Sequence, residues 1–138
     1  MSSIVWAWSD RLSLQYPEMD ATHQEFVTLC AQLSQAEDQT DYLLKLEALI
    51  AHSVQHFEQE NQWMRETQFP PAGCHQTEHD TVLSLMQEVH RRVCDGEMDL
   101  ADRLAEELPH WFEHHVATMD NMLAQFLRKP ALEQNLTV

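Results

Sequence analysis

The sequence predicts an all-α protein, an up-down-up-down four-helix bundle with an irregular N-terminal arm. Three observations lead to this prediction. Apolar residues recur at helical spacing in four long segments, the 138 residues include only 2 glycines, and no segment alternates apolar and polar residues as a strand would. Short connections between consecutive long helices make neighbouring helices antiparallel. We expect a single domain over residues 1–138, because this length suits one domain and is short for two.

The N-terminal arm and the first helix begin the chain. Residues 1–18 are rich in apolar side chains and end near Pro17, which we expect to stop any helix. The arm should therefore lie across the bundle and cover part of its core. The first helix is expected at about residues 20–37, with Asp20 or Thr22 as its N-cap.

The remaining three helices follow from apolar periodicity and from turn residues. They are expected at about residues 41–66, 73–94 and 99–128. Two prolines and a glycine separate the second helix from the third, and Asp95-Gly96 marks the next turn. Pro109 interrupts the last helix and should bend it, because proline removes one backbone hydrogen bond.

The composition excludes several classes of function. The formal net charge of −15 argues against nucleic acid and anionic membrane surfaces as partners, because both attract basic patches. No segment reaches the ~20 apolar residues of a membrane span, so we expect no membrane insertion. The 3 cysteines form no CxxC pair and the N-terminus does not resemble a signal peptide, which predicts a cytoplasmic protein with reduced thiols.

The 9 histidines are unusual, and several have the spacing of metal ligands. His56 and Glu60 are four residues apart, as are His75 and His79, and the two pairs flank the break between two helices. Residues at this spacing share one helix face. Two further helices add candidates, and the complete set is His23, His56, Glu60, His75, His79, His115 and Asp120. The other four histidines are expected at the surface or in contact with the ligands from outside: His52, His90, His110 and His114.

Five imidazoles and two carboxylates are too many protein ligands for one metal ion. Two ions can use them if the carboxylates bridge, and a nitrogen-rich set suits iron, with zinc as the competitor. His115 and Asp120 are five residues apart, about 500° on an ideal helix, so their side chains would diverge. We predict a π-type bulge between them, because such a bulge would bring the two side chains together.

Four segments of the chain, WSDRLSLQYPEMDATH, HFEQENQWM, HQTEH and WFEHHVATMD, resemble the hemerythrins, most closely the single-domain bacterial hemerythrins. The resemblance covers roughly residues 6–127 and includes all seven ligand positions. It implies reversible O2 binding by two irons with an oxo or hydroxo bridge, and no enzymatic activity. One iron would be held by His75, His79 and His115, and the other by His23 and His56, with Glu60 and Asp120 bridging. The two-histidine iron would keep an open position for O2.

The resemblance also implies an O2 pocket and points to two departures from the family pattern. Four residues resemble by position the residues that line this pocket in the family: Phe26, Phe57, Phe112 and Val116. Alternatively, these four side chains are ordinary parts of the core. Asn61 stands where many relatives have a glutamate, and Pro109 precedes Trp111 by two residues. We expect neither Asn61 nor Pro109 to contact a ligand.

Several alternatives to an oxygen carrier, store or delivery protein stay open. The same centre would serve a sensor or scavenger of O2, nitric oxide or iron, and a sensor would need a signalling protein as a further partner. A delivery protein would instead pass O2 to an O2-using enzyme. A ferritin-like oxidase would need a more carboxylate-rich site. His75 to His79 also spells HxxEH, a zinc hydrolase motif with Glu78 as general base, although this leaves five candidate ligands without a role.

Overall fold

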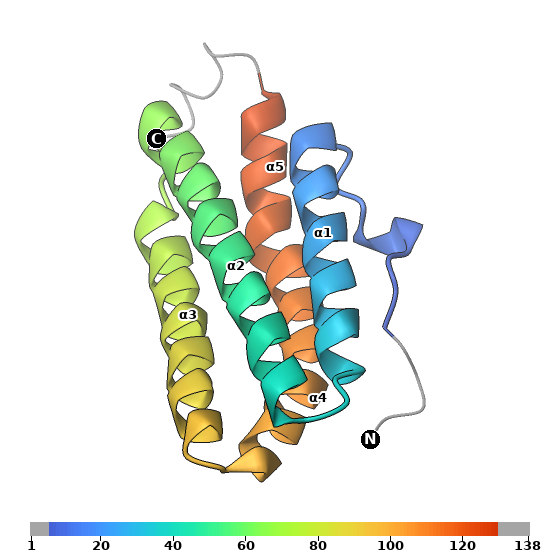
Figure 1. Ribbon diagram of the computed structural model, residues 1–138. Coiled ribbons are helices and arrows are strands. Elements are labelled where there is room, and N and C mark those ends of the chain that lie inside the picture. Colours follow the sequence, from blue (N-terminus) through green and yellow to red (C-terminus); the bar gives the residue numbers. More distant parts are fainter. Residues whose placement is uncertain (1–5, 130–138) are drawn as a thin grey trace.

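The computed structural model describes residues 6–129 of the chain and confirms the predicted four-helix bundle (Figure 1). The first five residues of the expected arm and residues 130–138 lie outside this range. Four helical rods alternate in direction, running down, up, down and up in Figure 1, and consecutive rods are joined by residues 35–38, 68–71 and 95–97. The first three rods are single helices: α1 (Pro17–Ser34), α2 (Gln39–Thr67) and α3 (Ala72–Cys94).

The fourth rod consists of three helical segments in line. Helix α4 (Met98–His115) leads into the π-helix η2 (Val116–Asp120), and α5 (Asn121–Arg128) follows directly. Helix α4 is continuous through Pro109. The predicted Asp95-Gly96 turn precedes this rod, and Gly96 has a φ of 95°, a conformation that glycine adopts without steric cost.

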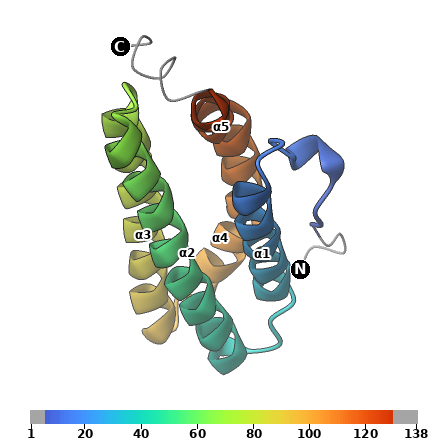
Figure 2. The same ribbon diagram turned by 90° about the horizontal axis from the view of Figure 1, so that it is seen from above.

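The rods surround a common interior. Helix α1 packs against α2 and α4, and α3 packs against the same two helices, as the view from above shows (Figure 2). Large apolar side chains fill this interior, and Phe26, Leu46, Met64 and Met86 have no exposed surface. Within the described residues, no helix is long and apolar enough to cross a membrane.

The described part of the arm is tied to the bundle by charge and by apolar burial. It contains one turn of 3₁₀-helix, η1 (Asp10–Leu12), and it buries Leu12. The Arg11 guanidinium donates two hydrogen bonds, of 2.9 and 2.7 Å, to the carboxylate of Glu113 on α4. The Trp6 indole N–H donates to the same carboxylate at 2.8 Å. The expectation that the arm covers part of the core is therefore confirmed for the residues from Trp6 onward.

The start of the first helix differs from the prediction. Pro17 does not stop the helix but is its first residue. Proline fits this position because the first backbone N–H of a helix has no intrahelical acceptor, so its absence costs no hydrogen bond. The N-cap is Tyr16 rather than Asp20 or Thr22. The Asp20 carboxylate instead accepts a hydrogen bond from the backbone N–H of Leu14 at 2.9 Å, which ties the arm to α1.

Candidate metal centre

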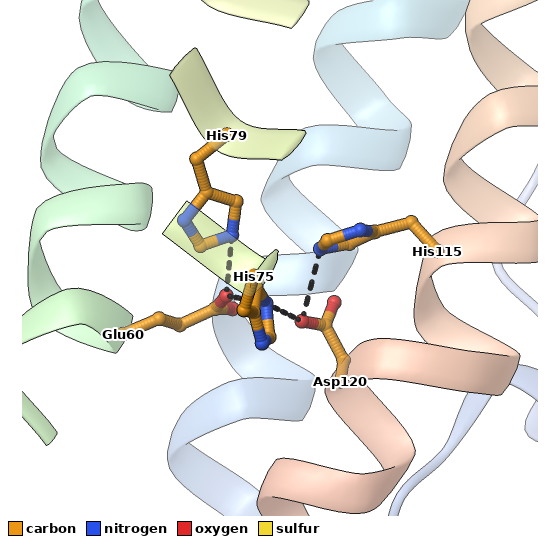
Figure 3. Close-up of side chains that lie close together, drawn as sticks. All are labelled: Glu60, His75, His79, His115 and Asp120. Atoms are coloured by element: carbon orange, nitrogen blue, oxygen red, sulfur yellow. Dashed lines mark ion pairs between the residues drawn. The ribbon is translucent and has the colours of Figure 1, made fainter. Parts of the chain in front are cut away.

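All seven candidate ligands lie together in the interior of the bundle, and every rod contributes at least one. Each residue is between 0% and 4% exposed. His23 comes from α1, while α2 and α3 contribute the two pairs spaced by four residues. The fourth rod adds His115 at the end of α4 and Asp120 at the end of η2. Figure 3 shows five of these side chains pointing toward one another.

The side chains form two groups of potential ligands that share one carboxylate. The larger group offers five donors, from Glu60, His75, His79, His115 and Asp120. The smaller group consists of His23, His56 and Glu60. The geometry thus places three imidazoles on one side and two on the other, which is the division that the sequence resemblance implied.

The Glu60 carboxylate lies between the two groups and turns one oxygen to each. Its Oε2 is 2.8 Å from Nε2 of His56 and 3.4 Å from Nε2 of His23. Its Oε1 is 3.1 Å from Nε2 of His79 and 3.4 Å from Nε2 of His75. Each oxygen therefore faces imidazoles of a different group.

The Asp120 carboxylate is divided in the same way. Its Oδ2 is 3.2 Å from Nε2 of His23. Its Oδ1 is 3.0 Å from Nε2 of His75 and 3.1 Å from Nε2 of His115 (Figure 3). Both carboxylates thus have the orientation that a bridge between two cations requires.

The distances suit ligands of a shared cation as well as direct ion pairs, and the missing hydrogen bonds favour a cation. Two donors at about 2.1 Å from one ion and at right angles are about 3.0 Å apart, close to the separations above. Buried polar side chains normally have hydrogen-bond partners. Here a group of buried atoms has none, and they face one another: Oε1 of Glu60, both carboxylate oxygens of Asp120, and Nε2 of His75, His79 and His115.

The π-helix η2 brings Asp120 to the centre. It spans Val116–Asp120 and connects directly to His115, so the predicted bulge between His115 and Asp120 is confirmed. The wider turn absorbs one extra residue, and the side chains of His115 and Asp120 consequently meet at 3.1 Å.

Two outer residues orient the imidazoles of the larger group. Nδ1–H of His115 donates to the carboxylate of Glu78 at 2.7 Å, and Nδ1–H of His79 donates to the amide oxygen of Asn61 at 3.0 Å. Each bond fixes the tautomer that leaves Nε2 free to bind a cation. The expectation that Asn61 contacts no ligand was therefore wrong. Sequence reasoning assigned neither residue this role, although each directly precedes or follows a candidate ligand.

Aromatic rings enclose the centre. Phe57 stacks on His79 with ring centroids 4.2 Å apart, and Trp111 stacks on His115 at 4.8 Å. Phe26 and Phe112 stack on each other at 4.4 Å, and Phe112 forms a T-shaped pair with His23 at 5.2 Å. Val116, the fourth residue expected in an O2 pocket, is also buried. These side chains form apolar walls beside the ligands of both groups.

The charges of the centre are strongly coupled. Burial opposes a charge on His23, but the carboxylates of Asp120 and Glu60 outweigh it and raise the pKa to about 10. The same competition raises the pKa of His75 to about 9. Burial likewise opposes a charge on Glu60, yet His56 and its neighbours hold the pKa of Glu60 well below its ordinary value. Without a bound cation, protonated imidazoles therefore compensate the carboxylates.

The histidines that were not expected as ligands lie outside the two groups. His52 is one turn before His56, and its Nδ1 is 3.5 Å from the carboxylate of Glu25. His90 pairs with Glu47 at 3.1 Å on the outer surface between α2 and α3.

Comparisons with known proteins agree with this fold and place the chain in a family. The family model for the hemerythrin HHE cation binding domain matches residues 15–127. A bacteriohemerythrin of Ralstonia nicotianae is 46% identical over 120 residues, which are 87% of each chain. A bacteriohemerythrin of Aquifex aeolicus is 31% identical over 79% of this chain and 87% of its own.

Solved hemerythrin structures share the fold at low sequence identity. The wild-type crystal structure has a TM-score of 0.80 at 17% identity and covers 88% of this chain and 97% of its own. A point mutant has a TM-score of 0.81 at 18% identity and covers 91% and 97%. The fold and the site together define a four-helix protein with a buried, histidine-rich cation site. The matches to the family model and to the curated relatives make the assignment specific: the chain belongs to the hemerythrin family.

Proposed function

We propose that this chain binds O2 reversibly at a non-haem di-iron centre and acts as an oxygen carrier, store or delivery protein. The observation that carries the proposal is the division of the two buried carboxylates. Glu60 and Asp120 each turn one oxygen to the three-histidine group and the other to the two-histidine group. This arrangement suits two neighbouring cations that share both carboxylates, whereas a single cation would leave one oxygen of each carboxylate unused.

The donor set favours iron over the competing metals. The larger group offers five donors, which is more than the four of a tetrahedral zinc site. Imidazole nitrogens outnumber carboxylates, which argues against magnesium and calcium. The ligands in this proposal are His75, His79 and His115 for one iron and His23 and His56 for the other, with an oxo or hydroxo group joining Glu60 and Asp120 as bridges.

The two-histidine side has room for a small ligand. It offers His23, His56 and one oxygen from each carboxylate, which is one donor fewer than the opposite side. Iron held by these residues would supply the two electrons that reversible O2 binding requires. The chain's own contribution on the side of His23 is an apolar wall, in which the buried rings of Phe26 and Phe112 slow the entry of water and protons from that direction.

The same centre would also serve a sensor or scavenger, with a signalling protein or an O2-using enzyme as the partner. The zinc hydrolase interpretation has less support. Its general base would be Glu78, but this carboxylate accepts the Nδ1–H bond of His115 and thus supports a ligand. The 3 cysteines all lie in the described residues and are unpaired, which suits our proposal of a cytoplasmic protein.

Metal analysis combined with absorption spectroscopy tests the proposal. The protein is loaded with Fe²⁺ under argon, assayed for iron, and its spectrum is recorded under argon, in air and after O2 is removed again. We expect two irons per chain and a colour that appears in air and disappears when O2 is removed. Zinc near one per chain without a colour change would refute a di-iron centre, and an irreversible colour would point to an oxidase or a sensor.

A matched pair of variants connects the result to the bridging carboxylate. Glu60→Ala should lose the pair of irons. Glu58→Ala removes an exposed carboxylate from the same helix and should retain both irons. Two irons per chain in Glu60→Ala would contradict the bridging role.

A further inference from the structure

A polar cleft between α1 and α2 leads from the surface to the two-histidine side of the centre. Its inner end is lined by His56 and Glu60, and its outer part by Glu25, His52, Gln55 and Gln59. The cavity has a volume of about 260 Å³. Six water molecules occupy about 180 Å³ in the liquid, which is less than the volume of this cavity.

The residues along this cleft change from exposed to buried in the order in which an entering ion would meet them. The side chain of Glu25 on α1 is 71% exposed, and that of His52 on α2 is 13% exposed. His56 follows one helical turn further, with its ring centroid 5.4 Å from that of His52. A carboxylate at the surface is therefore connected to the buried ligands by one intermediate imidazole.

His52 has an unused ligand atom at this point. Its Nδ1 faces the carboxylate of Glu25 at 3.5 Å, whereas its Nε2 is buried and has no hydrogen-bond partner. A buried nitrogen without a partner is unfavourable, and a cation or its water shell would satisfy it. Imidazole together with carboxylate is a donor pair suited to ferrous ion and related divalent metals.

The aromatic enclosure makes the other approaches unfavourable for a charged ion. Phe57 covers His79, Trp111 covers His115, and the Phe26–Phe112 stack closes the side next to His23. Moving a cation past such rings would require loss of its hydration without replacement. The polar cleft avoids this cost, and the net charge of −15 attracts cations toward the protein.

We propose that Glu25 and His52 form an entry site that captures a divalent cation and passes it to His56 and Glu60. The inference rests on the metal centre of the proposed function and adds a route by which that centre is filled. Glu25 attracts the hydrated ion, and His52 replaces part of its water shell before the ion reaches the buried ligands.

The test measures how fast metal-free protein takes up Fe²⁺ under argon. Samples are quenched with a chelator at increasing times, desalted and assayed for protein-bound iron. Glu25→Gln and His52→Asn should each slow uptake about tenfold, within the range by which charged clefts accelerate association. Both variants should finally bind as much iron as the wild type, because neither residue belongs to the centre.

A second Glu–His pair provides matched controls. Glu47 and His90 join α2 and α3 at the surface, 3.1 Å apart. Glu47→Gln and His90→Asn change the same residue types away from the cleft, and both should take up iron at the wild-type rate. Equal slowing in these variants would overturn the entry site, because the effect would then come from net charge alone.

Iron release separates an entry site from a structural role. A residue that speeds passage in both directions slows release when it is removed, whereas a residue that stabilises the centre accelerates release. We expect chelator-driven release to slow by the same factor as uptake. Uptake at the wild-type rate, faster release or a lower final iron content would each refute the entry site. Failure of the wild type itself to bind two irons would instead refute the proposed function.

Discussion

The hydrogen bond between Glu78 and His115 allows a quantitative test of how the outer residues support the metal centre. Nδ1–H of His115 donates to the Glu78 carboxylate at 2.7 Å, and the His115 side chain is 1% exposed. Glu78→Ala removes this acceptor and leaves a buried N–H on a proposed ligand. The imidazole then loses both its fixed orientation and part of its basicity.

Two independent estimates give the size of the effect. Hydrogen bonds to charged groups contribute about 1.5–3 kcal/mol. Loss of an outer partner of a ligating histidine typically costs about 10- to 100-fold in metal affinity, or about 1.4–2.8 kcal/mol. The Glu78 side chain is 28% exposed, so water can replace part of the lost bond. We therefore expect a loss near the lower limit, about tenfold for Glu78→Ala and less for Glu78→Gln, whose amide oxygen still accepts.

The assay is an anaerobic competition titration, in which protein and a coloured chelator compete for Fe²⁺. Glu88→Ala is the control, because Glu88 is an exposed carboxylate on the same helix that pairs with Arg91. The control should have the wild-type affinity. An affinity for Glu78→Ala within twofold of the wild type would refute the supporting role of Glu78.

Three further predictions concern the bridge, the charge balance and the core. Asp120→Ala should lose the pair of irons, and iron analysis that finds two per chain would show that Asp120 is not a bridge. In metal-free protein, the pKa of His23 is raised from 6.5 to about 10 by folding, so protonated His23 stabilises the folded state, and this contribution is complete below pH 6.5. This contribution is lost as the pH rises toward about 10, so urea denaturation should give a lower free energy of unfolding at pH 9.5 than at pH 6.5, and a constant value would contradict the coupling. Phe26→Ala should cost about 3–5 kcal/mol in urea denaturation, because Phe26 is fully buried, and a loss below 1 kcal/mol would show that the surrounding side chains collapse into the cavity.

The sequence was informative about the bundle because both the core and the ligands follow helical spacing. The pairs His56–Glu60 and His75–His79 lie on inward faces for the same reason that the apolar residues around them do. The five-residue interval from His115 to Asp120 violates this spacing, and that violation predicted the π-helix. Local spacing was sufficient wherever a side chain's direction depends on its own helix.

The outer partners were harder to predict because they depend on contacts between helices. Glu78 reaches His115 from another rod, and Asn61 reaches His79 across the α2–α3 interface. The HxxEH spacing distinguishes Glu78 among the 23 acidic residues only as a possible general base, and nothing in that spacing indicates a contact with His115. The start of α1 was misplaced for a local reason, since Pro17 blocks a helix interior but fits a first turn.

The π-helix also shifts the phase of the fourth rod. The buried stripe of α4 includes Leu108, Phe112 and His115, and at regular spacing it would continue to positions 119 and 122. Instead Asp120 and Leu123 are buried, whereas Met122 is 54% exposed. The buried positions after the π-helix are therefore one residue later than the stripe of α4 would place them. If all residues were kept and this segment became a regular α-helix, Asp120 would rotate about 100° relative to α4 and away from the histidines, whereas deleting one residue of the bulge would leave Asp120 four residues after His115 and on the same face.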